Sequence, residues 1–443
     1  MANHRDAYVE QLVTHFKQNE TDQQDYRLGI EFEHFLVNND NLRAVHYYGD
    51  NGIASILSRL AGSNWQVCNL GDDKKLIICL NKDNDEINLE PGGQIEFSFS
   101  PKNSIREIEE TYNTMINDLE PILKDNNYNL ITLGYQPVTK INELKILPKK
   151  RYKMMFDHFK KRGDLAHNMM LGTASTQISL DYSSEEDFSK KFAVASWLSP
   201  IIYATLDNTP IFEGKRTSEY AVRAKIWNDC DADRCGILEK SIEGNFTYKD
   251  YAEYIVDLPA IVDPAGEKPE PTELTFGEVF NKEVLTAEDI ELMLSFSFTD
   301  VRLKEYLEIR MADSFPLPLA LGYLALLKGI FYDQRNLDYF FKQVQKTSTA
   351  QVKKALKAIT EMGCQLPYTD SIMMMDWLDI LIERSLQGLS KSDQNYLLYL
   401  KNYLKDYLPP RKATGNTGNL KNDLDYSLVL PGSDIKDGYR KFK

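Results

Sequence analysis

The chain has 443 residues, of which 42% are hydrophobic and 27% charged, and this composition is ordinary for a soluble protein with a large core. Its net charge of −14 and its pI near 5.1 argue against nucleic acid as a ligand, because phosphate backbones need a basic surface. The most apolar run, residues 317–331, is shorter than the roughly 20 residues that span a bilayer, so we expect a buried helix and no membrane contact.

The cysteine content indicates a reducing compartment. The five cysteines form no regularly spaced set and show no zinc-binding spacing; they are Cys68, Cys79, Cys230, Cys235 and Cys364. The N-terminal segment lacks the continuous apolar core of a signal peptide. We therefore expect a cytoplasmic protein in which Cys230 and Cys235 are free thiols, although their spacing also permits a local disulfide.

The chain alternates between helical and strand patterns. Four strands with strict apolar–polar alternation are expected, and other segments predict helices, strands and one proline-rich loop. In the first part of the chain we expect a helix at 5–19, an acidic strand at 27–35, a helix at 51–62, a buried strand at 76–80, an acidic strand at 91–100, a helix at 104–126 and a strand at 128–137. The middle part predicts a basic helix at 149–164, a strand at 175–182, a helix at 187–206, a strand with a following turn at 219–236 and a loop at 263–275. From 282 onward we expect mostly helices, apart from a strand at 304–313.

This order predicts an α+β fold, an antiparallel sheet packed on helices, because the strands are spaced like hairpins and not like regular βαβ units. We expect one catalytic domain at 1–408, with the acidic strands mainly at 27–320 and a helical part at 282–408. A polar tail, 409–443, follows and is expected to be mobile. The chain has no glycine-rich phosphate loop, so a nucleotide would be held by the sheet and its metals.

The four alternating strands each place polar groups on one face, because successive strand side chains point to opposite sides. Those groups are Glu31 and Glu33 in RLGIEFEHF, Gln94 and Glu96 in PGGQIEFSFS, Gln177 and Ser179 in STQISLDY, and Glu308 and Arg310 in KEYLEIRMAD. Clustered carboxylates repel one another unless a cation lies between them, and oxygen ligands suit Mg²⁺ or Mn²⁺. The pattern predicts a metal and phosphate site.

The metal ligands that we predict are Glu31, Glu33, Glu90, Glu96 and Glu308. Arg310, two residues after Glu308 on the same face, would contact the γ-phosphate of ATP. Such a set suits the ligation of a carboxylate to an amine through an acyl phosphate, where metal ions and an arginine offset the repulsion between anions. Each signal alone also fits a solvated acidic pair, a surface ion pair or an ordinary Pro-Gly-Gly turn.

Six motifs, in the same order along residues 27–320, resemble the glutamate–cysteine ligases of the plant and bacterial type. They are GIEFEHF, LEPGGQIEFS, RYKMM, MMLGTASTQISLDY, RAKIWNDCDADRCG and VRLKEYLEIRMAD. The resemblance implies a fold related to glutamine synthetase, with a curved antiparallel sheet that forms a funnel around metals. It also implies that L-glutamate, L-cysteine and ATP are the substrates and γ-glutamylcysteine is the product.

The resemblance also implies roles for individual residues. The residues that match metal ligands are Glu31, Glu33, Glu96 and Glu308, and Glu90 is a further ligand. Arg310 matches the arginine that contacts the γ-phosphate, and Arg223 matches the residue that binds the glutamate α-carboxylate, in a pocket walled by Trp227. Gln177 is a metal ligand or a glutamate contact, and Arg151 and Tyr152 contact the nucleotide or a substrate. Core packing for Trp227 and a hydrogen bond within the sheet for Gln177 are the alternatives. Alternation places His34 on the apolar side, so we expect a buried histidine and not a ligand.

Two other functions fit the same pattern. One is a ligase of the same fold that uses another amine, since the tract Met311–Phe315 could line a different acceptor pocket. The other is a catalytically silent homologue that binds a nucleotide or a partner. Activity with a panel of amines distinguishes them.

Overall fold

A computed structural model describes residues 4–72, 74–263 and 270–430. Nine strands of the described chain form one sheet in the order β14-β15-β7-β1-β5-β4-β3-β2, with β6 paired to the end of β1, and all neighbours are antiparallel. These strands are β1 (Leu28–Asn38), β2 (Gln66–Leu70), β3 (Ile77–Lys82), β4 (Asp85–Leu89), β5 (Ile95–Ser98), β6 (Tyr128–Ile131), β7 (Thr176–Leu180), β14 (Val301–Leu303) and β15 (Leu307–Ile309). The predicted α+β class with a large antiparallel sheet is confirmed.

Three short strand pairs lie outside this sheet. They are β8 (Ile211–Phe212) with β9 (Lys215–Arg216), β10 (Cys235–Gly236) with β13 (Phe298–Thr299), and β11 (Pro259–Asp263) with β12 (Glu270–Thr275). The helices are α1 (Arg5–Gln18), α2 (Ile53–Ala61), α3 (Ile105–Asp125), α4 (Lys150–Phe159), α5 (Ala166–Gly172), α6 (Glu185–Thr205), α7 (Val222–Asn228), α8 (Tyr248–Asp257), α9 (Phe276–Val279), α10 (Ala287–Leu294), α11 (Leu317–Phe331), α12 (Gln334–Val344), α13 (Thr349–Met362), α14 (Met374–Gly388), α15 (Lys391–Asp406) and α16 (Leu420–Asp423).

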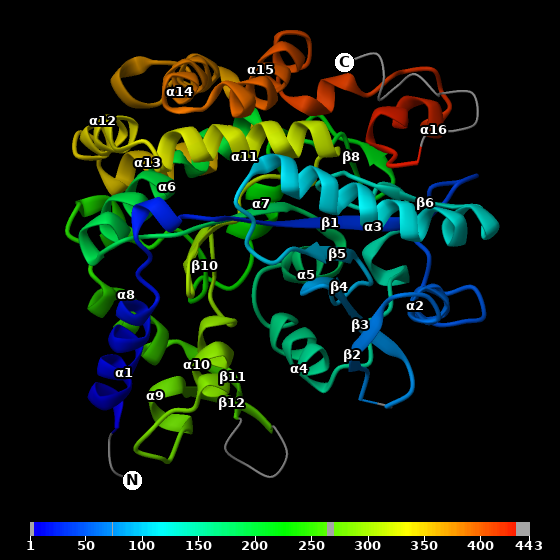
Figure 1. Cartoon of the computed structure of the whole chain (residues 1–443), viewed down its shortest axis with the longest axis horizontal. Coiled ribbons are helices and arrows are strands. Elements are labelled where there is room, and N and C mark those ends of the chain that lie inside the picture. The colour runs from blue at the N-terminus through cyan, green and yellow to red at the C-terminus, as the bar shows by residue number, and fades with distance from the viewer. Residues whose placement is uncertain (1–3, 73, 264–269, 431–443) are drawn as a thin grey trace.

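One face of the large sheet is apolar and packs on helices. Phe32 of β1 pairs with Phe97 of β5, and Ile30 pairs with Ile178 of β7; all four are at most 1% exposed. Helix α3 runs beside β1 in Figure 1, and Tyr112 of α3 packs its ring on Phe32. Helix α11 contacts α3 and strand β7 of the same sheet. Burial of this face fixes the strand register, since a one-residue slip would move the apolar side chains to the other face. The opposite face keeps the acidic side chains.

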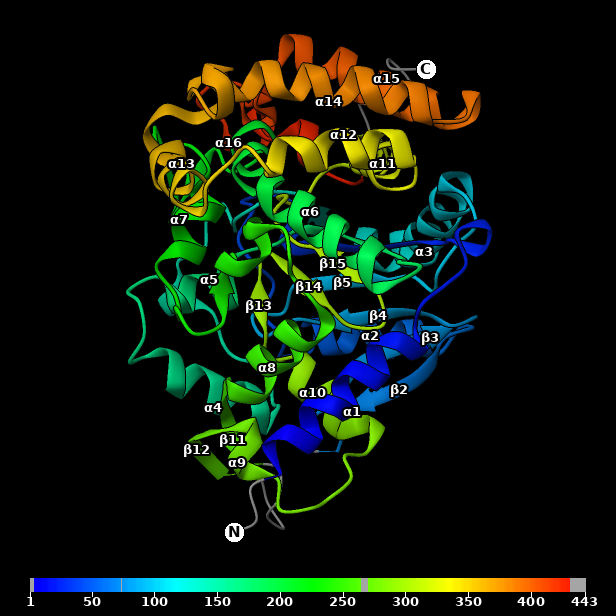
Figure 2. The same ribbon diagram turned by 90° about the vertical axis from the view of Figure 1, so that its left-hand side faces the viewer.

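The C-terminal helices form a second layer. Helices α14 and α15 lie over α11 in both views (Figures 1 and 2). Two glycines of α11 permit this close approach, because a Cβ on Gly322 would lie 2.6 Å from Leu400 Cβ and one on Gly329 would lie 2.6 Å from Ser385 Cβ. The predicted buried helix at 317–331 is confirmed. In the described residues, no helix is long and apolar enough to cross a membrane.

Two sequence predictions were wrong at particular segments. Residues 222–228 form helix α7 and not a strand, because Val222 and Ile226 are buried at helical spacing. The expected loop at 263–275 contains strand β12, which pairs with β11, while residues 264–269 lie outside the described chain. Both segments are short, and short patterns do not separate the two periods.

The segment after α15 packs on the body of the protein, where we had expected a mobile tail. Arg411 donates to Asp207 Oδ2 at 3.1 Å, and Leu428 forms a bridge with Ile131 of β6. The Asn129 side chain exchanges two hydrogen bonds with the Leu430 backbone, at 2.6 and 2.9 Å. The described part of this segment ends at Leu430, and residues 431–443 of the expected tail lie outside the described residues.

The cysteines differ partly from expectation. Cys230 and Cys235 are free, as predicted. Cys68 of β2 and Cys79 of β3 form a disulfide, which the sequence did not predict. Their contact depends on the register between two strands at the edge of the sheet, and sequence spacing carries no information about that register.

Candidate active site

The predicted acidic residues converge on one face of the large sheet. Glu33 of β1 lies opposite Glu96 of β5, and Glu31 lies opposite Gln177 of β7. Glu308 of β15 follows on the same face, because it lies opposite Ser179 of β7. Residues that lie directly opposite each other share a face, so segments almost 280 residues apart in sequence bring their carboxylates together.

Burial and mutual repulsion oppose ionisation of several of these acids. Burial, together with the charges of Glu96 and Glu308, raises the pKa of Glu31 to about 8. Burial and the neighbouring Glu90 and Glu33 raise the pKa of Glu96 to about 8. Burial and the charges of Glu33 and Glu31 raise the pKa of Glu90 to about 7. A divalent cation among these oxygens would restore the ionised forms. Carboxylate oxygens are ligands of the kind that Mg²⁺ or Mn²⁺ takes. Among the described residues, no three of these acids bring ligand oxygens within 4.8 Å of one another.

Glu308 has a different environment from the other acids. Its Oε2 accepts from Arg302 Nε and from Arg310 Nη1, both at 2.7 Å, and Lys304 Nζ lies 3.4 Å from Oε1. Although burial opposes ionisation, these three cations hold the pKa of Glu308 well below its usual range. Glu308 thus orients two arginines on the acidic face.

Gln177 connects the acids to the arginine. Its Nε2 donates to Glu33 Oε1 at 2.8 Å, and its Oε1 accepts from Arg310 Nη1. The amide therefore lies between a carboxylate and a guanidinium, where each of its two ends meets the matching partner. The structure places Gln177 in the cluster, by a hydrogen bond across strands.

Our sequence reasoning missed Arg302 and Lys304. Both lie in the hairpin of β14 and β15, and Arg302 lies opposite Glu308. The alternation in VRLKEYLEIR contains the signal, because Arg302, Lys304, Glu308 and Arg310 occupy every second position on either side of the turn. The hairpin therefore brings three cations and one acid together.

Helix α7 brings Arg223 and Trp227 to the same place. They are four residues apart, so they share one face of the helix. Arg223 Nη2 donates to the Arg310 carbonyl at 3.1 Å, and the Trp227 ring centroid lies 5.3 Å from the Arg223 guanidinium and 5.9 Å from that of Arg310. The indole thus contacts both arginines.

Several buried donors here have no partner. Within the described chain, Arg223 Nη1, Trp227 Nε1 and Arg310 Nε form no hydrogen bond. Tyr323 Oη of α11 and Asp313 Oδ1 are also buried without a partner, and both groups interact electrostatically with Arg223. Unsatisfied buried polar atoms are costly, and three donors together suit a bound carboxylate. Tyr323 had no sequence signal for this site, and Asp313 was noted only within the Met311–Phe315 tract.

Arg151 and Tyr152 lie near Glu90, on another side of the cluster. Tyr152 donates to the Leu89 carbonyl at 3.2 Å, and Arg151 Nη2 donates to Ser295 Oγ at 2.8 Å. Burial lowers the pKa of Arg151, and the charge of Glu90 opposes that effect. The Ser295 side chain also lines a pocket of about 330 Å³, together with His15, Lys304 and Tyr306.

His34 is buried and is not part of this cluster, as predicted. Its Nε2 lies 2.9 Å from Tyr112 Oη and its Nδ1 lies 3.2 Å from the Ile95 carbonyl. Burial lowers the pKa of His34 to about 4, so the ring is neutral at pH 7.

The raised pKa values predict how stability depends on pH without divalent cations. A carboxyl whose folded pKa lies above its unfolded value stabilises the protein below the unfolded pKa, and this contribution is lost as pH rises through the folded pKa. Stability should therefore fall between pH 4.5 and 8 because of Glu31 and Glu96. In the presence of EDTA, Glu96→Gln should raise Tm relative to the parent by about 5 °C at pH 8.5 and much less at pH 5. Calorimetry at the two pH values measures the difference, and an equal shift at both would contradict the assignment.

Comparison with known proteins places the chain in a family. A family model described as glutamate-cysteine ligase family 2 matches residues 27–381, most of the chain. The chain belongs to glutamate-cysteine ligase family 2. The resemblance inferred from the six motifs is thereby confirmed.

Individual family members align over most of their length. The chain is 30% identical over 365 residues to the chloroplastic glutamate–cysteine ligase of Arabidopsis thaliana. This alignment covers 80% of this chain and 69% of that protein. It is 29% identical over 391 residues to the chloroplastic glutamate–cysteine ligase of Solanum lycopersicum, and the alignment covers 86% of this chain and 73% of that protein. Among solved structures, glutamate–cysteine ligase from Francisella tularensis in complex with AMP has a TM-score of 0.51 at 12% identity, covering 94% of this chain and 89% of that chain. This structural likeness shows the fold.

Proposed function

We propose that this member of glutamate-cysteine ligase family 2 joins the γ-carboxylate of L-glutamate to the amine of L-cysteine, at the expense of ATP. One observation carries the proposal: the carboxylates of Glu31, Glu96 and Glu308 converge with Arg310 on one sheet face, beside the unpartnered donors of Arg223 and Trp227. This arrangement offers a cation-dependent region for phosphate and a neighbouring region for a carboxylate.

The reaction needs activation of a weak acylating agent. The γ-carboxylate oxygen of glutamate attacks the γ-phosphorus of ATP, ADP leaves, and γ-glutamyl phosphate forms. The amine of cysteine then attacks the acyl carbon, phosphate leaves, and one proton is lost from the nitrogen. Both steps bring anions together or spread negative charge over phosphoryl oxygens, so positive groups are required.

The chain's own residues would divide this work. Arg310 would donate to the transferring phosphoryl group, in an orientation fixed by Glu308 and Gln177. Arg223 and Trp227 would hold the α-carboxylate of glutamate through their free N–H groups. Positioning of the two substrates in this way removes much of the entropic barrier.

The acidic residues would hold the divalent cation. Glu31, Glu33, Glu90 and Glu96 are the proposed ligands, with Glu308 at the edge of the set. When bound, Mg²⁺ or Mn²⁺ neutralises charge on the triphosphate and on the developing phosphoryl group. We propose the pocket beside Lys304 and Tyr306 as the approach of the nucleotide, with Arg151 bonded to Ser295 of its wall and Tyr152 bonded to the Leu89 carbonyl.

An assay with purified full-length protein tests the proposal. Incubation with ATP, Mg²⁺, L-glutamate and L-cysteine should release ADP and phosphate in equal amounts with γ-glutamylcysteine, detected by mass spectrometry. Parallel reactions replace cysteine with other amino acids and simple amines. Turnover with another amine but not with cysteine would overturn the acceptor, and absence of ADP release with every amine would overturn the activity.

Replacement of Arg223 should weaken glutamate binding more than it slows the chemical step. Arg223→Lys keeps the charge but loses the planar pair of donors, so KM for glutamate should rise about tenfold or more with little change in the KM for ATP. Initial-rate kinetics with each substrate varied separately measure both constants. Lys225→Arg, at a half-buried position of the same helix that pairs with Glu219, is the control. An unchanged KM for glutamate would remove Arg223 from the substrate pocket.

We also propose that the protein acts in the cytoplasm. The low cysteine content and the metabolite substrates support this location. Fractionation of the source cells tests it. In such a reducing compartment, thiol reductants would have access to the Cys68–Cys79 disulfide.

A further inference from the structure

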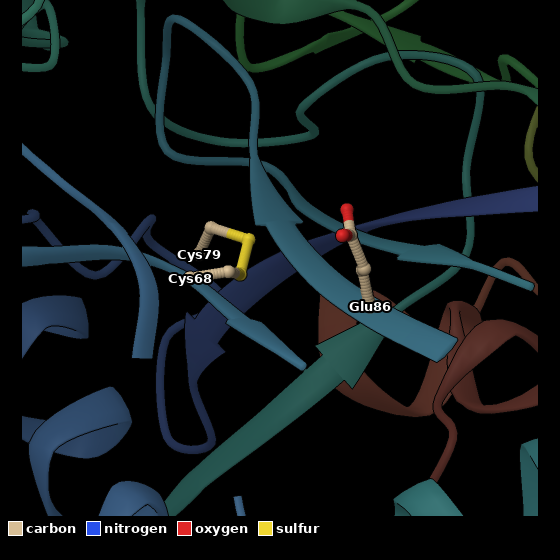
Figure 3. Close-up of side chains that lie close together, drawn as sticks. All are labelled: Cys68, Cys79 and Glu86. Carbon is tan, nitrogen blue, oxygen red and sulfur yellow. A yellow bond between two sulfur atoms is a disulfide. The ribbon is translucent and has the colours of Figure 1, made fainter. Parts of the chain in front are cut away.

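A second group of potential ligands lies at the edge of the large sheet. The sulfur atoms of Cys68 and Cys79 and a carboxylate oxygen of Glu86 all lie within 4.8 Å of one another. Figure 3 shows the disulfide beside the Glu86 side chain, which belongs to the neighbouring strand β4. Two sulfur atoms and one carboxylate are therefore close together outside the predicted magnesium site.

The strand register explains why these three side chains meet. A register shift in β2 leaves Cys68 as the extra residue between Val67, which pairs with Leu80, and Asn69, which pairs with Cys79. Bulges redirect a side chain in this way. Cys79 in turn lies opposite Asn88 of β4, two residues from Glu86 on the same face. The cluster is thus fixed by backbone pairing on three strands.

The Glu86 carboxylate is held in place and is available to a cation. Asn88 Nδ2 donates to Glu86 Oε2 at 3.0 Å. Among residues 4–72, 74–263 and 270–430, no lysine, arginine or histidine forms an ion pair with Glu86. Cys68 is exposed on the edge strand β2, Cys79 is buried, and Glu86 is half-buried. Both a reductant and an ion therefore have access from solvent.

We propose that reduction of the Cys68–Cys79 disulfide creates a site for a thiophilic divalent cation of the Zn²⁺ class, with Cys68, Cys79 and Glu86 as ligands. Two molecules of a low-molecular-weight thiol reduce the bond and leave as one disulfide, so that the protein gains two thiols. Ion binding then releases both thiol protons to solvent and forms two metal–thiolate bonds. The proposal is independent of the ligase reaction.

The geometry and the ligand chemistry favour this class of ion. Zn²⁺ binds thiolate at about 2.3 Å, so two thiolates of a tetrahedral site lie about 3.8 Å apart. The two Cα atoms are 5.3 Å apart, which permits that sulfur separation by side-chain rotation. Thiolates select soft ions and do not suit Mg²⁺ or Ca²⁺. Three protein ligands leave a fourth position for water.

The site is separate from the predicted magnesium ligands but is connected to them. Ser98 Oγ donates to Glu96 Oε1 at 2.6 Å, and Asn88 Nδ2 lies 3.5 Å from the same hydroxyl. A hydrogen-bond chain therefore runs from Glu86 through Asn88 and Ser98 to Glu96. The test must accordingly distinguish thiolate ligation from binding to the carboxylates.

Cadmium provides such a readout, because Cd²⁺ bound to thiolate gives an ultraviolet charge-transfer band that carboxylate ligation does not give. We would use full-length protein with Cys230→Ser and Cys235→Ser, reduced with a phosphine, in saturating Mg²⁺. During titration with Cd²⁺, the absorbance of the charge-transfer band should reach its maximum at one Cd²⁺ per chain. Added Zn²⁺ should displace the Cd²⁺ and remove the band. The unreduced protein should show no band.

Two variants and one control complete the experiment. Cys68→Ser, at an exposed position, should abolish the band, and Glu86→Gln should weaken Cd²⁺ binding about tenfold or more while both thiols remain. Glu110→Gln, on exposed α3 surface, should have no effect. Circular dichroism confirms that each variant is folded. No band in the reduced protein, a band that persists in Cys68→Ser, or unchanged affinity in Glu86→Gln would each overturn the proposed site.

Discussion

Arg310→Ala should lower kcat about 10³-fold, because the guanidinium is proposed to offset charge on the transferring phosphoryl group. The fold should survive, since Glu308 keeps Arg302 at 2.7 Å and Lys304 at 3.4 Å when Arg310 is removed. The KM for glutamate should change much less than kcat, in contrast to the Arg223 variant. Steady-state kinetics of ADP release measure both constants.

Two companion variants make this result specific. Arg310→Lys keeps one positive charge but loses the second donor of the fork, so its kcat should lie between those of the parent and the alanine variant. Arg106→Ala, on an exposed face of α3, should leave kcat unchanged. A kcat within threefold of the parent for Arg310→Ala would exclude Arg310 from the phosphoryl step.

Glu96→Gln should give the second large effect. The amide preserves the size of the side chain and keeps an oxygen for the Ser98 hydroxyl, but it removes one negative charge from the cation site. We expect kcat to fall about 10²-fold or more at fixed Mg²⁺, and the Mg²⁺ concentration for half-maximal rate to rise. Rates measured across a Mg²⁺ titration separate the two effects.

Glu31→Gln should behave in the same way, because the charge of Glu96 contributes to the raised pKa of Glu31 and the two acids are expected to share a cation. The double variant should then cost less than the product of the two single effects, since the first change already removes the shared ion. Glu110→Gln is the matched surface control. Full activity in either single variant, with an unchanged Mg²⁺ requirement, would contradict the predicted ligand set.

The large sheet was predictable because one of its faces is buried. Alternation at Ile30 and Phe32 requires the neighbouring acids to point the other way, and the structure follows that requirement in β1, β5, β7 and β15. The same alternation predicts that the acids and Arg310 share one face of the sheet. The roles of these residues remain predictions for the experiments above.

Other parts depend on contacts that alternation does not encode. Helix α7 was mistaken for a strand, since seven residues do not distinguish a period of 3.6 from a period of 2. Tyr323 reaches the vicinity of Arg223 from helix α11, and no local pattern marks it. Asp313 lies in the Met311–Phe315 tract, but its nearness to Arg223 could not be read from the sequence. The Cys68–Cys79 contact depends on a bulge, which becomes visible only once β2 and β3 are paired.

The pairing of β1 with strands on both sides makes this segment unusually sensitive to changes in length. Deletion of a single residue between positions 28 and 33 would move each following side chain of β1 to the opposite face of the sheet. Carboxylates would then enter the hydrophobic core, and phenyl rings would take their places on the face proposed to bind metal. Insertions and deletions here should be selected against far more strongly than conservative substitutions, and a library of length variants would reveal the difference.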